Sequence, residues 1–147
     1  MLLSEETKKI LRQYGWSPER KVDAKPFVDG LKAEGYVVFE RAVEFLGQYG
    51  GLYLKMPQYR GSGWDTLHFD AILAAGRIFI DNVWFYEGRV GEKLVPVGEA
   101  YNGHYVLMLS ESGKMYGAYD DLLRLAGQDC EDAIESMYRR LETPKIP

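Results

Sequence analysis

Hydrophobic residues recur every three or four positions over the first third of the chain, a spacing typical of helices that bury one face. The pattern predicts three helices, over residues 4–15, 24–35 and 39–50. Ordinary end signals support these bounds, because Ser4 is a candidate N-cap and a glycine closes each helix.

The period changes after Gly50-Gly51, where the first predicted strand begins. Residues 52–56 are typical of a strand that a proline ends, and residues 66–69 are expected to pair with it. The two strands then form a hairpin around an intervening loop, residues 57–65. Two less regular helices are expected next, over residues 70–76 and 80–89.

The last third of the chain predicts more strands. Residues 94–98 form a short strand in which Pro96 indicates an edge or an end of pairing, because proline lacks the backbone N–H. Residues 105–109 and 114–118 are two strand-like segments on either side of a turn, and they predict a second hairpin.

Two helices are expected to close the chain. Asp120 is a candidate cap for a helix that ends at Gly127, and a final helix starts at Asp129. Helices at both ends with strands between them predict an α+β fold with a central, mainly antiparallel or mixed sheet. The length of 147 residues fits one domain, residues 1–147.

Composition indicates a globular protein that does not bind nucleic acid. Hydrophobic residues make up 46% and charged residues 27% of the chain, and the formal net charge is −4. Nucleic-acid-binding proteins carry a basic patch instead. Six acidic residues and one basic residue lie between residues 120 and 135. This run is first interpreted as a solvated helix face, and second as a docking surface for a basic partner.

The candidate reactive residues do not form a recognisable catalytic motif. Cys130 is the single cysteine, so no internal disulfide is expected, and its acidic neighbours raise its pKa. His68 and His104 lie beside aromatic residues in predicted strands, where structural roles are more common. We therefore expect no catalytic residue, no metal site and no cofactor.

The ends and hydrophobic runs of the chain predict a cytoplasmic protein. The first residues do not resemble a signal peptide, because acidic residues follow the short start Met1-Leu2-Leu3 at once. No apolar run reaches the length that a membrane span needs. No membrane partner is expected.

Two stretches of the chain carry distinctive motifs. Residues 42–52 follow the pattern A-x-x-F-L-x-x-aromatic-Gly-Gly-Leu, and residues 14–23 contain Gly-Trp, Arg and Val-Asp in that order. These motifs resemble those of the SUKH superfamily, in particular its immunity proteins from bacterial polymorphic toxin systems, and residues 94–127 resemble the second conserved block of that family. These motifs also have structural interpretations: Gly50-Gly51 would supply left-handed backbone, and Arg20 would pair with Asp23.

The resemblance implies a SUKH-like immunity domain that binds and neutralises a cognate toxin, often a nuclease, and is not an enzyme. A nuclease presents a basic surface, which an acidic protein could cover after electrostatic steering. Residue type and expected exposure select the candidate partner-binding residues: the aromatic anchors Trp64 and Tyr86, and the charge partners Asp65, Glu99, Asp120 and Asp121.

Two alternatives remain at this point. The first is a regulatory or scaffolding adaptor of the same superfamily. The second is a small hydrolase that uses His68 or His104, which would require both histidines to converge with a carboxylate in one pocket. The sequence leaves the oligomeric state open.

Overall fold

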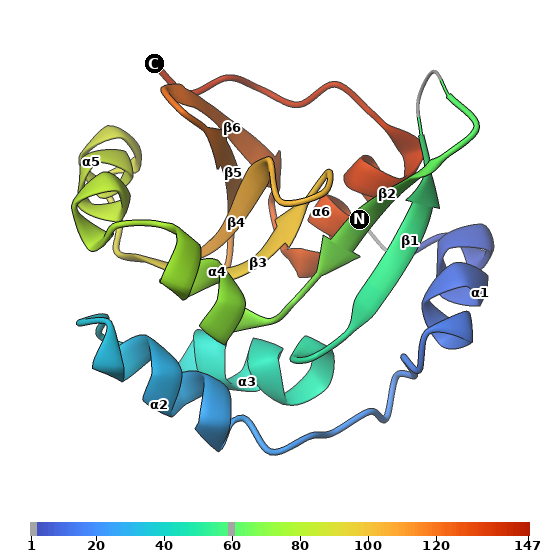
Figure 1. Ribbon diagram of the computed structural model, residues 1–147, viewed down its shortest axis with the longest axis horizontal. Helices are drawn as coiled ribbons and strands as arrows, with labels where there is room; N and C mark the ends of the chain where they lie inside the picture. Colours follow the sequence, from blue (N-terminus) through green and yellow to red (C-terminus); the bar gives the residue numbers. More distant parts are fainter. Residues whose placement is uncertain (1–2, 59–60) are drawn as a thin grey trace.

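The computed structural model describes residues 3–58 and 61–147 and contains one six-stranded antiparallel sheet with helices packed around it (Figure 1). The strands follow the chain order from one edge of the sheet to the other: β1 (Tyr53–Pro57), β2 (Trp64–His68), β3 (Leu94–Ala100), β4 (Tyr105–Ser110), β5 (Met115–Tyr119) and β6 (Leu122–Gly127). The helices are α1 (Glu5–Gln13), α2 (Lys25–Ala33), α3 (Glu40–Tyr49), α4 (Ala71–Arg77), α5 (Ile80–Val90) and α6 (Cys130–Arg139). The predicted α+β class is confirmed.

Helices lie on both faces of the sheet. Helices α4 and α5 pack on β3, and α6 packs on β6 (Figure 1). Val106 and Ala118 face the α4–α5 side, whereas Tyr105 and Ala126 face α6. Successive side chains of a strand point to opposite faces, so the two helix layers enclose the sheet between them.

The three N-terminal helices form where the hydrophobic period predicts them. The Ser4 side chain accepts a hydrogen bond from the backbone N–H of Thr7, as expected for an N-cap. The carboxylate of Glu135 in α6 is buried and accepts hydrogen bonds from Ser4 N at 2.6 Å and Thr7 Oγ1 at 2.9 Å. This carboxylate therefore fastens α1 to the last helix of the fold.

Arg20 supports the end of α3. The predicted pair with Asp23 is replaced by hydrogen bonds from the Arg20 guanidinium to Gln48 O at 2.5 Å and Gly50 O at 2.9 Å. A cation at these carbonyls stabilises the C-terminal end of the helix dipole. Gly51 has the predicted left-handed backbone, with φ +83°, whereas Gly50 has φ −56° and makes room for the ring of Phe27.

The hairpin of β1 and β2 is confirmed, and so are the two helices after it. The predicted loop 57–65 includes residues 59 and 60, which lie outside the described residues. Asp70 caps α4 by accepting a hydrogen bond from Leu73 N. No helix among the described residues has the length and apolar character to cross a membrane.

Strand β3 lies inside the sheet, so Pro96 does not mark an edge strand, whereas the other predicted role, an end of pairing, agrees with the structure. Two residue pairs connect β2 to β3, Leu67 with Ala100 and His68 with Glu99. Pro96 lies beyond the end of this pairing and next to a bulge in the β4 register, so its missing N–H leaves no ladder bond unmade on the β2 side.

Residues 122–127 form strand β6, so the predicted helix after Asp120 is wrong. Strand β6 pairs with β5, and its outer side bonds to the C-terminal segment through Leu125 N to Pro144 O and Ile146 N to Leu123 O. These tertiary hydrogen bonds override the helical spacing of the leucines. Asp120 has φ +52° and lies in the turn between β5 and β6.

The change from helix to strand divides the acidic run. Asp120 and Asp121 lie at one end of β6, and Asp129 caps α6 at the other end. The strand separates them by about 20 Å, at roughly 3.3 Å per residue. The acidic residues 120–135 therefore do not form one helix face.

A substitution at Gly117 tests the packing of side chains around β5. A Cβ at Gly117 would lie 2.0 Å from Cζ of Tyr105, whose ring crosses this position. We expect Gly117→Ala to lower the free energy of unfolding by about 1–3 kcal/mol, because the ring must move out of a filled site. Urea unfolding measures the change.

Gly88→Ala is the matched control in α5, where an added Cβ meets no atom within 4 Å. It should raise the free energy of unfolding by about 0.5–1 kcal/mol, because alanine favours the helix. Equal effects of the two substitutions would contradict the packing assigned to Tyr105.

Candidate functional site

A cavity of about 720 Å³ opens between α4, α5 and the sheet. Its floor includes Glu99 of β3, Val106 of β4 and Ala118 of β5. The end of α4, the first turns of α5 and the turn between β5 and β6 form its walls. We call this space the α5 cavity.

Four of the six candidate residues from the sequence line the α5 cavity: Tyr86, Glu99, Asp120 and Asp121. Asp120 and Asp121 are exposed, as expected. Tyr86 is 5% and Glu99 3% exposed, so the prediction that these two side chains are exposed is wrong. They form part of the cavity wall and floor, and they hold its other residues in place.

Two side chains of α5 fix the turn that carries Asp120 and Asp121. The hydroxyl of Tyr86 donates a hydrogen bond to Asp120 O, and Arg89 Nη1 donates to Asp121 O at 2.7 Å. Burial, followed by the charge of Asp120, raises the pKa of Tyr86, so this hydroxyl keeps its proton to donate. Arg89 also binds the chain end at Ile146 O.

The carboxylates of this turn remain available. The structural bonds of Asp120 and Asp121 use their backbone oxygens. Within the described residues, neither carboxylate takes part in a hydrogen bond or an ion pair. Two negative charges are therefore presented to solvent on a turn whose backbone is held in place.

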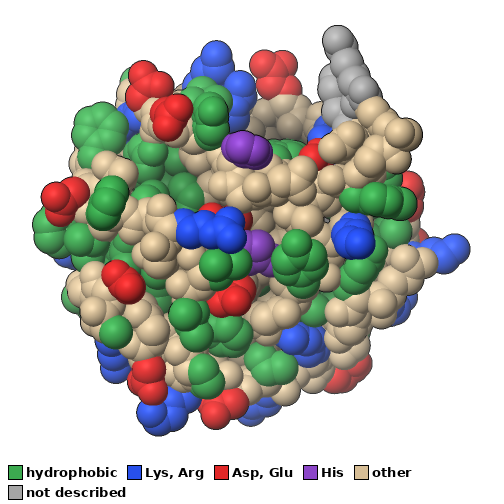
Figure 2. Space-filling model, viewed as in Figure 1, with side chains coloured by type: hydrophobic (Ala, Val, Ile, Leu, Met, Phe, Trp, Pro, Cys, Tyr) green, Lys and Arg blue, Asp and Glu red, His purple; other side chains and the backbone are tan. Residues whose placement is uncertain are grey.

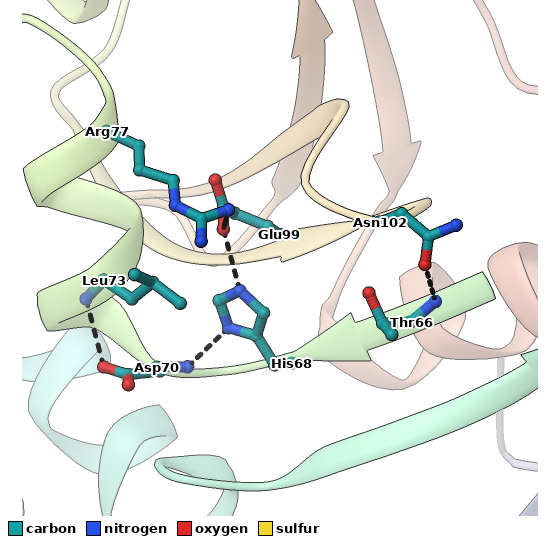
Figure 3. A network of polar contacts seen from close by, with 7 residues as sticks. All are labelled: Thr66, His68, Asp70, Leu73, Arg77, Glu99 and Asn102. Carbon is teal, nitrogen blue, oxygen red and sulfur yellow. Dashed lines mark hydrogen bonds and ion pairs between the residues drawn. The ribbon is translucent and has the colours of Figure 1, made fainter.

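His68, Glu99 and Arg77 form a polar network beside the cavity floor (Figure 3). His68 Nδ1 accepts a hydrogen bond from Asp70 N at 3.0 Å, so the ring proton is on Nε2. Nε2–H then donates to Glu99 Oε1 at 2.9 Å, and Arg77 Nη1 donates to the same oxygen at 3.2 Å. The buried carboxylate is thereby paired, and it positions the half-exposed guanidinium of Arg77 at the mouth of the cavity.

Exposed aromatic side chains border the α5 cavity. Phe85 is 58% and Tyr119 51% exposed, and both line the cavity. Figure 2 shows hydrophobic side chains gathered over α5 at the left of this face, with acidic side chains at their border. Aromatic groups surrounded by charge are typical of a protein interface.

Trp64 and Asp65 lie away from this cavity, at the start of β2. Trp64 is 57% exposed, as expected. Asp65 is half-buried and already paired, because it accepts hydrogen bonds from Arg140 Nη2 at 3.1 Å and Asn102 Nδ2 at 3.2 Å. The structure thus separates these two candidates from the other four.

The two histidines line different cavities among those that the described residues form. His104 lines the α5 cavity and a second cavity of about 430 Å³ on the α6 side, and its ring contacts Tyr119 at the boundary between them. His68 lines a smaller cavity of about 220 Å³. The convergence that the hydrolase alternative requires is therefore not found among the cavities of the described residues.

Cys130 and the acidic residues also offer little reactive chemistry. Burial, followed by the charge of Asp129, raises the pKa of Cys130 to about 12, so the thiolate is scarce at neutral pH. The described residues contain no group of three or more histidine, cysteine, aspartate or glutamate side chains placed to hold a metal ion.

A comparison with known protein families shows which family the chain belongs to. A sequence profile for the SUKH-3 immunity protein family matches residues 3–139. The chain belongs to the SUKH-3 immunity protein family. No match to the chain was found among curated proteins or among solved structures.

Sequence reasoning missed three residues of this SUKH-3 chain that define the α5 cavity: Arg77, Phe85 and Tyr119. Part of the signal was present in the sequence. Trp84 and Phe85 are adjacent in a predicted helix, so their side chains point about 100° apart and at most one of them can face the centre of the core. The contact between Arg77 and Glu99 has no such signal, because it depends on how α4 crosses β3.

Tyr86→Phe tests how the turn of the SUKH-3 chain is held. Loss of the hydroxyl leaves Asp120 O without its donor, and we expect the free energy of unfolding to fall by about 1 kcal/mol. Amide hydrogen exchange should accelerate around residues 119–122 more than elsewhere. Tyr53→Phe is the control, because Tyr53 is half-exposed and its hydroxyl bonds to no described residue. Uniform acceleration along the chain would contradict the local role.

Proposed function

We propose that this SUKH-3 chain is a cytoplasmic, non-enzymatic immunity protein that neutralises a cognate bacterial toxin by binding to it. Membership of the immunity protein family is the observation that carries the proposal. The α5 cavity supports a binding role, because it combines exposed aromatic side chains with carboxylates that no described residue pairs. These are the features of a protein interface with charged partners.

Charge supports a nuclease as the toxin. The chain has a formal net charge of −4, and the lining of the α5 cavity has a formal charge of −2 with His104 neutral. A nuclease needs a basic surface to bind the phosphate backbone of its nucleic-acid substrate. An acidic inhibitor would be attracted to that surface and would associate rapidly.

Co-expression with the toxin domain encoded beside this gene tests the function. Survival of the host and co-purification of a stable complex are expected if the chain neutralises that toxin. An active toxin that still kills the host and forms no complex would contradict the proposal and favour the adaptor alternative. A catalytically inactive toxin is the control for toxicity.

Asp120→Asn/Asp121→Asn tests the proposed binding face. Asparagine removes both charges and tolerates the left-handed backbone of Asp120. We expect the association rate with the toxin at low salt to fall roughly 10-fold and its salt dependence to weaken, because rim charges steer association. Stopped-flow fluorescence measures both.

Glu19→Gln/Glu44→Gln is the matched control, because it removes the same charge from exposed residues that do not line the α5 cavity. Its effect on the association rate should be clearly smaller. Equal effects of the two double variants would mean that net charge alone matters and would remove Asp120 and Asp121 from the interface.

A further inference from the structure

We infer that the α5 cavity receives one arginine side chain of the toxin, with its guanidinium group directed to Glu99 and flanked by Asp120 and Asp121. This inference rests on the proposed function and gives the partner's chemistry at that same site. The observations that carry it are an unbonded carboxylate oxygen at the floor, the charge of the walls and the aromatic faces at the entrance.

Glu99 supplies the floor of this site. Its side chain is 4% exposed, and Oε1 accepts both hydrogen bonds of the network, from His68 and Arg77. Oε2 accepts no hydrogen bond from the part of the chain that the structure describes. Figure 3 shows Oε2 directed away from His68, and the α5 cavity is the Glu99-lined cavity that excludes His68.

Glu99 Oε2 is not one of the fully buried atoms that lack a partner, so it reaches the space of the α5 cavity, where it can accept a hydrogen bond from a ligand. A guanidinium group carries five N–H donors in a planar arrangement that matches carboxylates. One inserted group can therefore donate to Glu99 Oε2 and still reach the carboxylates of the wall. An ammonium group has fewer donors and is more strongly hydrated.

The walls favour a cation over an anion. Three carboxylates and the single guanidinium of Arg77 line the cavity, and Arg77 is already held by Glu99 Oε1. Tyr86 and Arg89 fix the backbone of the turn, so the carboxylates of Asp120 and Asp121 need little reorganisation to receive a charge. A preorganised negative site is thus open to a further positive group.

The entrance suits an arginine in particular. Phe85 and Tyr119 expose aromatic rings at the cavity, and guanidinium groups stack on such faces. Arg89 already lies over the ring of Phe85, with 5.5 Å between Cζ and the ring centre. The volume of about 720 Å³ lies within the range of pockets that hold small molecules, so a whole side chain fits.

The first test uses the free protein and methylguanidinium chloride, so it does not depend on the toxin. Nuclear magnetic resonance titration should give saturable shifts in the amides of Glu99, Gly103 and Asp120. Asp120→Asn/Asp121→Asn should weaken this binding at least several-fold, whereas Glu19→Gln/Glu44→Gln should leave it unchanged. Absence of saturable shifts, or equal binding by both double variants, would overturn the site.

The second test uses the toxin complex. Each exposed arginine of the toxin is changed to alanine, and each variant is measured against the wild-type chain, Glu99→Gln and Asp120→Asn/Asp121→Asn. One arginine should lower the affinity at least 10-fold and show non-additive effects with both substitutions. Urea unfolding of Glu99→Gln controls for damage to the network with His68, and the Asp120 and Asp121 variant keeps that network intact.

The outcomes separate this inference from the proposed function. Neutralisation of the toxin with no coupled arginine would overturn the inference and leave the immunity function in place. If the chain fails to neutralise the toxin in the co-expression assay, the proposed function is contradicted. The methylguanidinium titration would still decide whether the cavity binds a guanidinium group.

Discussion

The structure depends on the short junction between β2 and β3. Two residue pairs join these strands, and in one of them the side chains of His68 and Glu99 also bond to each other. Because β2 stops there, the rest of β3 has no neighbouring strand on that side, and helices α4 and α5 pack over it instead. Asn102 strengthens the junction by accepting a hydrogen bond from Thr66 N. The hairpin of β1 and β2 is thereby attached to the sheet while space remains for the helices that form the cavity.

The same junction explains why a carboxylate is buried beside the α5 cavity. Burial of an unpaired charge is costly, and Glu99 is compensated on one oxygen by His68 and Arg77. His68 is the last residue of β2, and Arg77 is the last residue of α4. The junction fixes the first partner, and the short helix that follows brings the second. The charge network is thus a consequence of where β2 ends, and its position next to the α5 cavity follows from the same fact.

Local signals in the sequence predict most of this fold, and the failures have one cause. The candidate cap Ser4, the helix start predicted at Asp129 and the closing glycines of the first three helices place these elements well, because each signal acts within one turn of chain. The candidate cap Asp120 fails, because a strand follows it. Strand β6 is missed because its leucines have helical spacing, while its hydrogen bonds come from β5 and the C-terminal segment. The sequence also predicts two exposed acids at 120 and 121, but it does not predict that Tyr86 and Glu99 are buried, since their burial depends on the packing of α5 and β3.

The turn between β5 and β6 uses its backbone and its side chains differently. Its backbone oxygens accept the hydrogen bonds of Tyr86 and Arg89, whereas its carboxylates bond to no described residue. A backbone oxygen is the same in every residue, so the fold constrains position 120 mainly through its left-handed conformation. No hydrogen bond or ion pair among the described residues fixes the charge carried there. Under the proposed function, structural bonds that use backbone oxygens would leave both carboxylates free to serve the toxin interface without cost to the fold.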